Sequence, residues 1–397
     1  MRSVEEALAG ILAVARLTEA ETLPLDACHG RVPAAFTLTA PVDVPPFDNS
    51  SMDGYALRAT DTPGRLRVVG EVAAGASALP AVVPGTAVRI MTGAPMPPGA
   101  DAVAPIEVVR ADDAEVDVPA TEPGAYLRRA GHDTHAGDQV NLPEEALTAA
   151  ALGLVASLGL GQLAVRRRPR VAILSTGDEL QPPGAPLAAG QIHDANGIAL
   201  AAAIIEAGGE PVPLERTPDD PGLIEEQLTR GAAEADLLVA SGGVSVGRHD
   251  HVRDVIERLG TLDFWRIRMQ PGKPLAFGAV RGVPVVGLPG NPVSALVTFE
   301  LFARPLIRRM LGLAGSGRLT LPATVQERMA KDEERRAFLR VRVAREADGL
   351  AAWPAGGQQS SQLRPLATAN ALLIVPEGAR AAEAGRTYDA LLLGAIA

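Results

Sequence analysis

The sequence is nearly devoid of cysteine and poor in aromatic residues. Cys28 is its single cysteine, and aromatic side chains make up 3% of the chain. One thiol excludes an internal disulfide, a CxxC redox pair and a thiolate-rich zinc site, and it fits a reducing compartment. With so few aromatics, hydrophobic cores must be built mainly from Ala, Val and Leu. We therefore expect a soluble, cytoplasmic, globular protein.

The chain also lacks an excess of positive charge. Its 37 Lys and Arg residues face 47 Asp and Glu residues, which gives a formal net charge of -10. General nucleic-acid binding relies on Lys and Arg that neutralise phosphates, so this class of function is disfavoured. An anionic ligand would need a local basic pocket.

No targeting or membrane-spanning segment is predicted. Residues 1–16 lack the basic start and uninterrupted apolar run of a signal peptide. The spacing of Ser3 and Glu6 instead indicates a capping box that begins an amphipathic helix. Residues 147–165 carry no charge, but glycines interrupt them. We interpret this stretch as a buried helix followed by a strand, and we expect no membrane association.

What the chain does contain is a repeated strand–helix pattern. A length of 397 residues exceeds one ordinary core, so two to four domains are expected. Strands are predicted at residues 170–174, 211–214, 236–240 and 283–287, and helices at residues 196–207, 219–231, 250–259 and 292–311. Apolar strands separated by helices predict an α/β fold with a doubly wound parallel sheet, whose ligands sit beyond the carboxyl ends of the strands.

The flanking regions are rich in short β-like runs. Residues 40–137 contain many Pro and Gly residues between such runs, which predicts a separate β-rich domain. The runs after residues 312–317 predict a small terminal β-barrel or sandwich. Helical stretches within residues 1–30 and 143–158 could pack together.

Three predicted strand ends carry loops with glycines and hydroxyls, at residues 175–179, 241–245 and 288–294. Glycines let backbone N–H groups approach a ligand closely, and the last loop leads directly into a predicted helix. Any one loop could equally be a tight turn needed for packing, but three together favour an anion-binding site. The motifs GxxxxGK[ST] and GxGxxG are absent, which disfavours a P-loop nucleotidase and a dinucleotide-binding Rossmann domain.

Charged residues of both signs accompany these loops. Lys273 lies in a rigid Pro-Gly turn, where a fixed ammonium would suit an oxyanion, although a solvated turn lysine is the alternative. Carboxylates recur at loop ends, as Asp178, Glu179, Asp219, Asp220 and Asp250. Such hard oxygen ligands hold Mg²⁺ together with substrate phosphates, whereas helix capping would also explain Asp219 and Asp250. The six histidines lack a recognised zinc-ligand spacing, so zinc is disfavoured.

Two polar loops of unusual density occur in the β-rich region, at residues 49–55 and 89–95. Arg128, Arg129 and Asp133 follow them. On physical grounds alone, Asp53-Gly54 could be no more than a turn signal.

Six segments, in order and at family spacing, carry a resemblance that covers nearly the whole chain. They are Ser51-Met-Asp-Gly-Tyr55, Arg89-Ile-Met-Thr-Gly-Ala-Pro95, Ser175-Thr-Gly-Asp-Glu-Leu180, Ser241-Gly-Gly-Val-Ser245, Pro271-Gly-Lys-Pro274 and Leu288-Pro-Gly-Asn-Pro-Val-Ser-Ala295. Together they resemble the molybdopterin molybdenumtransferases, the MoeA family, to which the gephyrin E domain is related. These enzymes insert molybdate during assembly of the molybdenum cofactor.

The resemblance implies a subunit of four parts. These are a helical linker domain of residues 1–39 and 138–168, a β-rich insert of residues 40–137, a molybdopterin-binding α/β domain of residues 169–314, and a C-terminal β-barrel or sandwich domain of residues 315–397. It further implies a homodimer with the active cleft between subunits, adenylylated molybdopterin and molybdate as substrates, release of AMP, and a requirement for Mg²⁺. Molybdopterin adenylyltransferase and recipient molybdoenzymes are candidate partners.

Site residues follow from the same resemblance, motif by motif. It implies catalytic roles for Asp53, Thr92, Asp133, Glu179, Asp219 and Asp250. It implies substrate binding by Arg128, Ser241, Gly242, Gly243, Ser245, Lys273, Gly290, Asn291, Pro292, Ser294, Arg340 and Ser361. It implies Mg²⁺ ligands among Asp178, Glu179, Asp219 and Asp250. Asp53 and Thr92 are expected to arrive from the partner subunit.

The sequence departs from the family at two positions where lysine is common. Arg266 keeps the positive charge with a different geometry, whereas Gln270 loses the charge. Oxyanion binding must then depend on Lys273, Arg266 and backbone donors.

Two alternative functions stay open. Molybdopterin adenylyltransferases, which use ATP, share the Ser-Gly-Gly and Leu-Pro-Gly-Asn-Pro loops, but they lack the insert and the C-terminal domain. A gephyrin-like scaffold is the second alternative, and the intact carboxylates argue against a purely structural role.

Overall fold

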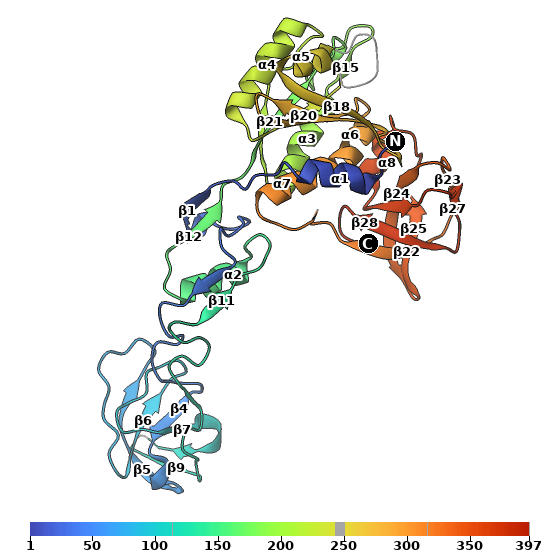
Figure 1. Ribbon diagram of the computed structural model, residues 1–397. Helices are drawn as coiled ribbons and strands as arrows, with labels where there is room; N and C mark the ends of the chain where they lie inside the picture. The colour runs from blue at the N-terminus through green and yellow to red at the C-terminus, as the bar shows by residue number, and fades with distance from the viewer. Residues whose placement is uncertain (113, 243–250, 316, 397) are drawn as a thin grey trace. The chain divides into compact units, whose positions relative to one another are not determined.

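The structure, a computed structural model, describes residues 1–112, 114–242, 251–315 and 317–396, without the side chain of Phe264 (Figure 1). The chain separates into two compact units. One comprises Met1–Glu21 and Arg166–Ala397, and the other comprises Thr22–Val165. Within the described residues, no helix is both long enough and apolar enough to cross a membrane.

The unit of Thr22–Val165 is built around one six-stranded sheet. Its strands, in spatial order, are β7 (Ala102–Pro105), β4 (Gly54–Leu57), β6 (Thr86–Ile90), β5 (Gly64–Val72), β9 (Glu115–Val118) and β8 (Arg110–Ala111). Both faces are covered, because Tyr55 and Leu57 belong to one core cluster and Ala56 to another. The alternation follows from the two-residue period of a strand. The β-rich domain expected from the Pro and Gly content is therefore present.

Smaller elements complete this unit. Ladders form between β3 (Asn49–Ser50) and β10 (Leu127–Arg128), between β2 (Thr37–Thr39) and β11 (Gln139–Asn141), and between β1 (Ala20–Pro24) and β12 (Gln162–Arg166). Short 3-10 helices occur at η1 (Leu25–Ala27), η2 (Ala59–Asp61) and η3 (Ile106–Val108). The helix α2 (Ala149–Ser157) begins at the N-cap Thr148 and is followed by β12, which confirms the helix and strand predicted for residues 147–165. The helix buries Ala151 and Val155 alone, so the prediction that it is a buried helix was wrong.

The two predicted N-terminal helical stretches divide between different cores. The helix α1 (Val4–Leu12) has the predicted capping box of Ser3 and Glu6, and it buries Val4, Ala7 and Ile11 in the core of the α/β domain. By contrast, α2 packs in a cluster that contains Cys28. The expected packing of residues 1–30 on residues 143–158 therefore applies to the segment around Cys28 and not to α1.

The α/β domain contains the predicted strands in a six-stranded sheet. The order is β16 (Glu210–Pro213), β13 (Arg170–Ser175), β17 (Leu237–Ser241), β21 (Val283–Leu288), β20 (Pro274–Val280) and β18 (Gly260–Arg266). The first four are parallel, whereas β20 and β18 form an antiparallel hairpin at one edge. A short parallel pair, β14 (Leu180–Gln181) and β15 (Ile192–His193), follows β13.

Helices cover both faces of this sheet, which makes it doubly wound (Figure 1). The helices α3 (Ala195–Glu206), α6 (Pro292–Thr298) and α7 (Arg304–Met310) share a core with alternate strand residues such as Ile173 and Val239. The π-helix η4 (Phe299–Ala303) joins α6 to α7. The helices α4 (Pro221–Glu234) and α5 (His251–Leu259) pack on the opposite face with Leu174 and Ala240.

The C-terminal region forms a closed five-stranded barrel. Its strands are β24 (Arg336–Glu346), β25 (Gly349–Pro354), β22 (Thr320–Val325), β28 (Thr387–Leu392) and β26 (Ala371–Val375), and pairing of β26 with β24 closes the ring. The short pair of β23 (Met329–Ala330) with β27 (Ala381–Ala382) and the helix α8 (Leu363–Thr368) accompany it. The strand β19 (Met269–Gln270) pairs with β24 and ties the barrel to the α/β domain.

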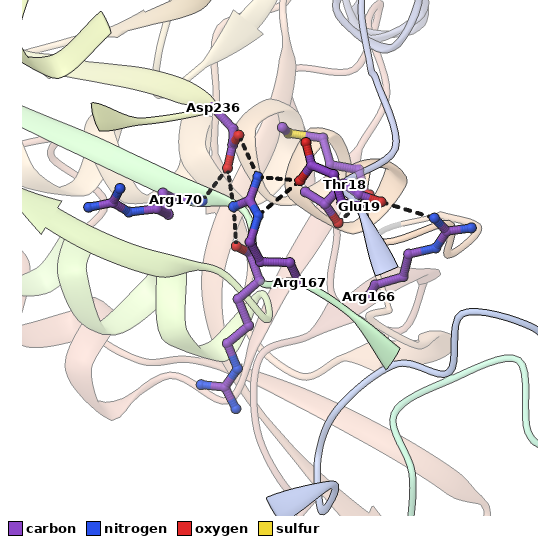
Figure 2. A network of polar contacts seen from close by, with 8 residues as sticks. Thr18, Glu19, Arg166, Arg167, Arg170 and Asp236 are labelled. Atoms are coloured by element: carbon purple, nitrogen blue, oxygen red, sulfur yellow. Dashed lines mark hydrogen bonds and ion pairs between the residues drawn. The ribbon is translucent and has the colours of Figure 1, made fainter. Parts of the chain in front are cut away.

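An ion-pair network lies near the amino ends of β13 and β17 (Figure 2). The guanidinium of Arg167 donates two hydrogen bonds to Asp236, of 2.8 and 2.9 Å, and two to Glu19, of 3.0 and 2.8 Å. Asp236 also accepts from the backbone N–H of Arg170 at 2.7 Å. Arg166 donates to the carbonyl of Thr18 at 2.9 Å. Both points at which the chain leaves and re-enters the unit are thus tied to the sheet.

We predict that Arg167→Met destabilises the Arg166–Ala397 unit by about 1–3 kcal/mol, because it removes charge-assisted bonds from a partly buried carboxylate. The methionine retains much of the apolar stem. Thermal and urea unfolding should show the loss. Arg230→Met, which removes exposed pairs with Glu234 and Glu215, serves as the control and should cost less than about 0.5 kcal/mol. Equal effects of the two variants would contradict the assigned role.

The network should also make stability depend on pH. Partial burial favours a higher pKa for Asp236, but the bonds from Arg167 and Arg170 outweigh it and lower that pKa. A lowered folded-state pKa stabilises the fold above the unfolded pKa, and this contribution is lost as pH falls through the folded pKa. The difference in unfolding free energy between wild type and Arg167→Met should therefore shrink between pH 7 and pH 3. A constant difference across that range would rule out the ionised Asp236 as its source.

Candidate functional site

The carboxyl ends of three neighbouring strands meet at one edge of the α/β sheet. Ser175 of β13 pairs in register with Ser241 of β17, and Ser241 pairs with Leu288 of β21. The three predicted loops therefore begin side by side, as the parallel strand order requires. Gly243, Ser245 and Asp250, which were predicted as site residues, lie outside the described residues.

Buried hydroxyls line this edge. The exposed fractions are 6% for Ser175, 6% for Thr176, 3% for Ser241 and 5% for Ser294. The hydroxyls of Ser175 and Thr176 have no hydrogen-bond partner among the described residues. A buried polar atom without a partner costs about 1–3 kcal/mol, so such atoms commonly have a ligand or water partner. The edge therefore presents hydroxyl donors suited to an oxygen-rich ligand.

Asn196, the first residue of the helix predicted at residues 196–207, connects the loops. Its side-chain nitrogen donates to the hydroxyl of Ser241 at 2.8 Å and to the carbonyl of Gly290 at 2.7 Å. The capping role belongs to Asp194, which accepts from the N–H of Gly197 at 2.9 Å. A better capping residue two positions upstream is the signal that could have marked Asn196 for another role.

The loop after β21 makes contact with the C-terminal barrel domain. Asn291 donates from its side chain to the hydroxyl of Ser360 at 3.1 Å, and the N–H of Val293 donates to the carbonyl of Ser360 at 3.3 Å. Pro292 occupies the first turn of α6, where its missing N–H costs nothing. The predicted residue Ser361 is exposed and follows Ser360 directly.

Arg340, a predicted substrate contact, is fully buried in β24. Its guanidinium donates to the carbonyls of Gly357 and Gln359, at 3.0 and 3.2 Å. Burial lowers the pKa of Arg340 to about 10, so it stays charged at neutral pH. In this structure Arg340 shapes the loop that leads to Ser360 and Ser361. The burial of a charged side chain in an apolar strand was not predictable from the pattern.

The turn that carries Lys273 lies at the same edge of the sheet. Ala276 pairs with Gly287, which places the start of β20 beside the end of β21. Gly272 adopts φ +98°, and a Cβ there would lie 2.4 Å from the hydroxyl of Thr298 in α6, so the close packing of this turn requires glycine. Lys273 itself is exposed, and Arg266 pairs across the hairpin with Pro274.

Gln270 has a structural partner that accounts for its uncharged side chain. Its side-chain oxygen accepts a hydrogen bond from the N–H of Asp332 at 3.2 Å. The residue that replaces a common family lysine therefore fastens the α/β domain to the barrel domain. Lys273 and Arg266 both lie at this edge of the sheet, and their role in oxyanion binding stays a prediction.

Three carboxylates approach one another next to the end of β13. The backbone N–H of Asp219 donates to Asp178 at 3.1 Å, and a bridge joins Thr176 to Thr217. Partial burial and then the neighbouring charges of Asp178 and Glu179 raise the pKa of Asp219. The cap of α4 is Asp220 rather than Asp219, so helix capping does not explain Asp219.

The donor chemistry of this carboxylate group suits a hard divalent cation, which would relieve the mutual repulsion. In the described part of the chain, no three His, Cys, Asp or Glu residues are arranged to hold a metal ion together. Mg²⁺ commonly takes one or two carboxylates and completes its shell with water and substrate phosphates. The residues present therefore fit Mg²⁺ as an ion bound together with a phosphorylated ligand.

Two of the predicted residues in the Thr22–Val165 unit, Asp53 and Thr92, are in direct contact. The carboxylate of Asp53 accepts two hydrogen bonds from Thr92, one from its hydroxyl and one from its N–H, both at 2.7 Å. These bonds, with the charge of Arg89, lower the pKa of Asp53. Arg128 pairs with Asn49 across the β3–β10 ladder, and Asp133 is exposed. The Asp53–Thr92 contact shows that Asp53 does more than mark a turn.

Known proteins match this chain along nearly its full length. Three family models match it: the MoeA N-terminal region (domain I and II) over residues 2–159, the probable molybdopterin binding domain over residues 172–309, and the MoeA C-terminal region (domain IV) over residues 322–393. Molybdopterin molybdenumtransferase 2 of Mycobacterium tuberculosis is 41% identical over 394 residues, which span 95% of this chain and 96% of that protein. Molybdopterin molybdenumtransferase of Bacillus subtilis is 33% identical over 404 residues, with 98% and 94% covered.

Solved structures agree with this result. A crystal structure of a molybdopterin biosynthesis MoeA protein from Pyrococcus horikoshii has a TM-score of 0.85 and 33% identity, and it covers 100% of both chains. A second structure of a MoeA protein from that organism has a TM-score of 0.82 and 28% identity, with 99% and 100% covered. The chain therefore belongs to the molybdopterin molybdenumtransferase family of molybdenum-cofactor biosynthesis.

Proposed function

We propose that this protein inserts molybdate into adenylylated molybdopterin and releases AMP, which yields the molybdenum cofactor. The observation that carries the proposal is the gathering of three kinds of group at one sheet edge. Buried hydroxyls lie at Ser175 and Ser241, at the ends of β13 and β17, and the carboxylates beside Asp219 follow β13. The cations Lys273 and Arg266 lie at the same edge, on the neighbouring hairpin of β20 and β18. This combination suits a ligand that carries phosphates and a second oxyanion.

The residues at this edge promote the reaction by holding charged groups and hydrogen-bond donors around the substrate. Cleavage of a phosphoanhydride depends mainly on positioning and on neutralisation of the charge that develops on phosphate oxygens. In this proposal the buried hydroxyls of Ser175, Thr176 and Ser241 donate to such oxygens. Lys273 supplies a positive charge from a packed turn and thus suits molybdate. No protein nucleophile is needed, since the sulfurs of molybdopterin capture the metal.

Mg²⁺ is part of the proposal, with one or two ligands drawn from Asp178, Glu179 and Asp219 and with Asp250 as a further candidate. When bound, it would supply positive charge to the phosphoanhydride. The carboxylates themselves fix where that charge resides. Partial burial, and then repulsion from Asp178 and Glu179, raises the pKa of Asp219, and a bound cation would offset both effects.

A second subunit is also part of the proposal. We infer a cytoplasmic homodimer in which Asp53 and Thr92 of one subunit complete the site of the other, with Arg128 and Asp133 nearby. The lowered pKa of Asp53 keeps its carboxylate ionised at neutral pH. Its second oxygen accepts no hydrogen bond from the described residues and is available to a ligand or a metal-bound water. Molybdopterin adenylyltransferase and recipient molybdoenzymes are the proposed upstream and downstream partners.

Two reaction mixtures test the proposed reaction. The protein is incubated anaerobically with adenylylated molybdopterin, molybdate and Mg²⁺, and separately with molybdopterin, ATP and Mg²⁺. We expect AMP release in the first mixture only, with loss of that release when EDTA removes the metal. Consumption of ATP in the second mixture would instead support the adenylyltransferase alternative. Inactivity in both mixtures would favour a scaffold.

The Asp53 carboxylate offers a second test. We expect Asp53→Ala to slow AMP release by about 100-fold or more, because it removes a charged group from the reacting site. Its melting temperature should stay near that of wild type, since the Asp53–Thr92 bonds are exposed to water. Asp26→Asn, which changes an exposed carboxylate of the same unit, is the control and should retain full activity. Full activity of Asp53→Ala would remove Asp53 from the mechanism.

A further inference from the structure

The side-chain amide of Asn196 donates two hydrogen bonds, both to loops of the candidate site. One bond of 2.8 Å reaches the hydroxyl of Ser241 at the end of β17, and one of 2.7 Å reaches the carbonyl of Gly290 after β21. Asn196 itself lies in the first turn of α3, which follows a different segment of the chain. Three strand–helix connections are therefore held by one amide group.

The direction of the Asn196 amide follows from its partners. The carbonyl of Gly290 can only accept a hydrogen bond, so the nitrogen of the amide, and not its oxygen, must face it. The same nitrogen then donates to Ser241, whose oxygen acts as the acceptor. The hydrogen of the Ser241 hydroxyl must point elsewhere, and the described residues provide no acceptor for it. Ser241 is thus prepared to donate to a ligand.

The bond to Gly290 has a second effect on the neighbouring peptide. In a planar trans peptide, the carbonyl and the following N–H point in opposite directions. A Gly290 carbonyl drawn toward Asn196 therefore turns the N–H of Asn291 away from α3. Within the described part of the chain this N–H has no acceptor, while the Asn291 side chain is held by Ser360 at 3.1 Å. The orientations of the Asn291 N–H and of the Ser241 hydroxyl therefore both depend on Asn196.

We propose that Asn196 is a positioning residue that orients the Ser241 hydroxyl and the Asn291 N–H toward a phosphate oxygen of the substrate. The inference rests on the proposed function for the identity of the ligand. This role differs from that of a residue that only holds the loops together, because a positioning residue changes ligand affinity through Ser241. A residue that only holds the loops together would change the stability of the fold, and Ser241 would contribute as much to ligand binding with it as without it.

A double-mutant cycle separates the two roles. The dissociation constant of adenylylated molybdopterin is measured by anaerobic equilibrium dialysis, without molybdate, for wild type, Asn196→Ala, Ser241→Ala and the double variant. We expect each single change to raise the constant about 10-fold or more, because misplaced donors lose most of their effect. The double variant should be weakened by clearly less than the product of the two factors.

Two controls accompany the cycle. Ile198→Ala alters an exposed side chain of the same helix, 65% accessible, and should leave the dissociation constant unchanged. Asn196 and Lys273 make no hydrogen bond to each other, so the factors by which Asn196→Ala and Lys273→Ala raise the dissociation constant should multiply. If Asn196→Ala fails to fold, Asn196→Ser, which keeps one donor, replaces it throughout.

The outcomes are distinct. An unchanged dissociation constant for Asn196→Ala, or factors that multiply for Asn196 and Ser241, would overturn the positioning role. Failure of wild type to bind adenylylated molybdopterin would contradict the proposed function instead. In that case a crystal structure of Asn196→Ala still decides the inference, because the Gly290 carbonyl should turn from its wild-type direction. A Gly290–Asn291 peptide that keeps its direction would refute it.

Discussion

The parallel register of β13, β17 and β21 is the constraint on which the candidate site depends. Because these strands run in the same direction, their ends bring Ser175, Ser241 and the loop after Leu288 to one edge. The antiparallel hairpin of β20 and β18 then adds Lys273 and Arg266 from the side. Among the described residues, the donors, cations and carboxylates of this site come from different loops. Backbone pairing across the sheet assembles them.

Much of this arrangement could be predicted, since the sequence pattern and the physics agree. Apolar runs separated by capped helices specified the parallel strands, and polar residues after each strand specified the loops. The antiparallel hairpin was not predicted, because its strands flank the Pro-Gly turn that dominated the interpretation of residues 270–274. The packing of α1 and α2 in different cores was also not predicted. An amphipathic pattern indicates that one face of a helix is buried, but it does not identify the core that buries it.

The residues whose roles were not predicted from the sequence have long-range contacts in common. Asn196 is an ordinary residue near a helix start, and its partners are about 45 and 94 positions away along the chain. Asp219 and Asp220 are adjacent carboxylates before a helix, and only the structure shows that Asp220 caps it. Gln270 lacks the charge of the lysine that is common in the family, and it accepts a hydrogen bond from Asp332. For Asn196, Asp219 and Gln270, a contact with a residue distant in the sequence decides the role.

The burial of Arg340 has a further electrostatic consequence. Among the described residues its guanidinium meets backbone carbonyls and no carboxylate, so its charge is solvated by dipoles and is not neutralised. A charge in a weakly polarisable interior projects its field farther than one screened by water. The surface formed by residues 357–361 should therefore carry a positive potential without displaying a cation. In a chain of net charge -10, this potential would guide anions toward one particular loop.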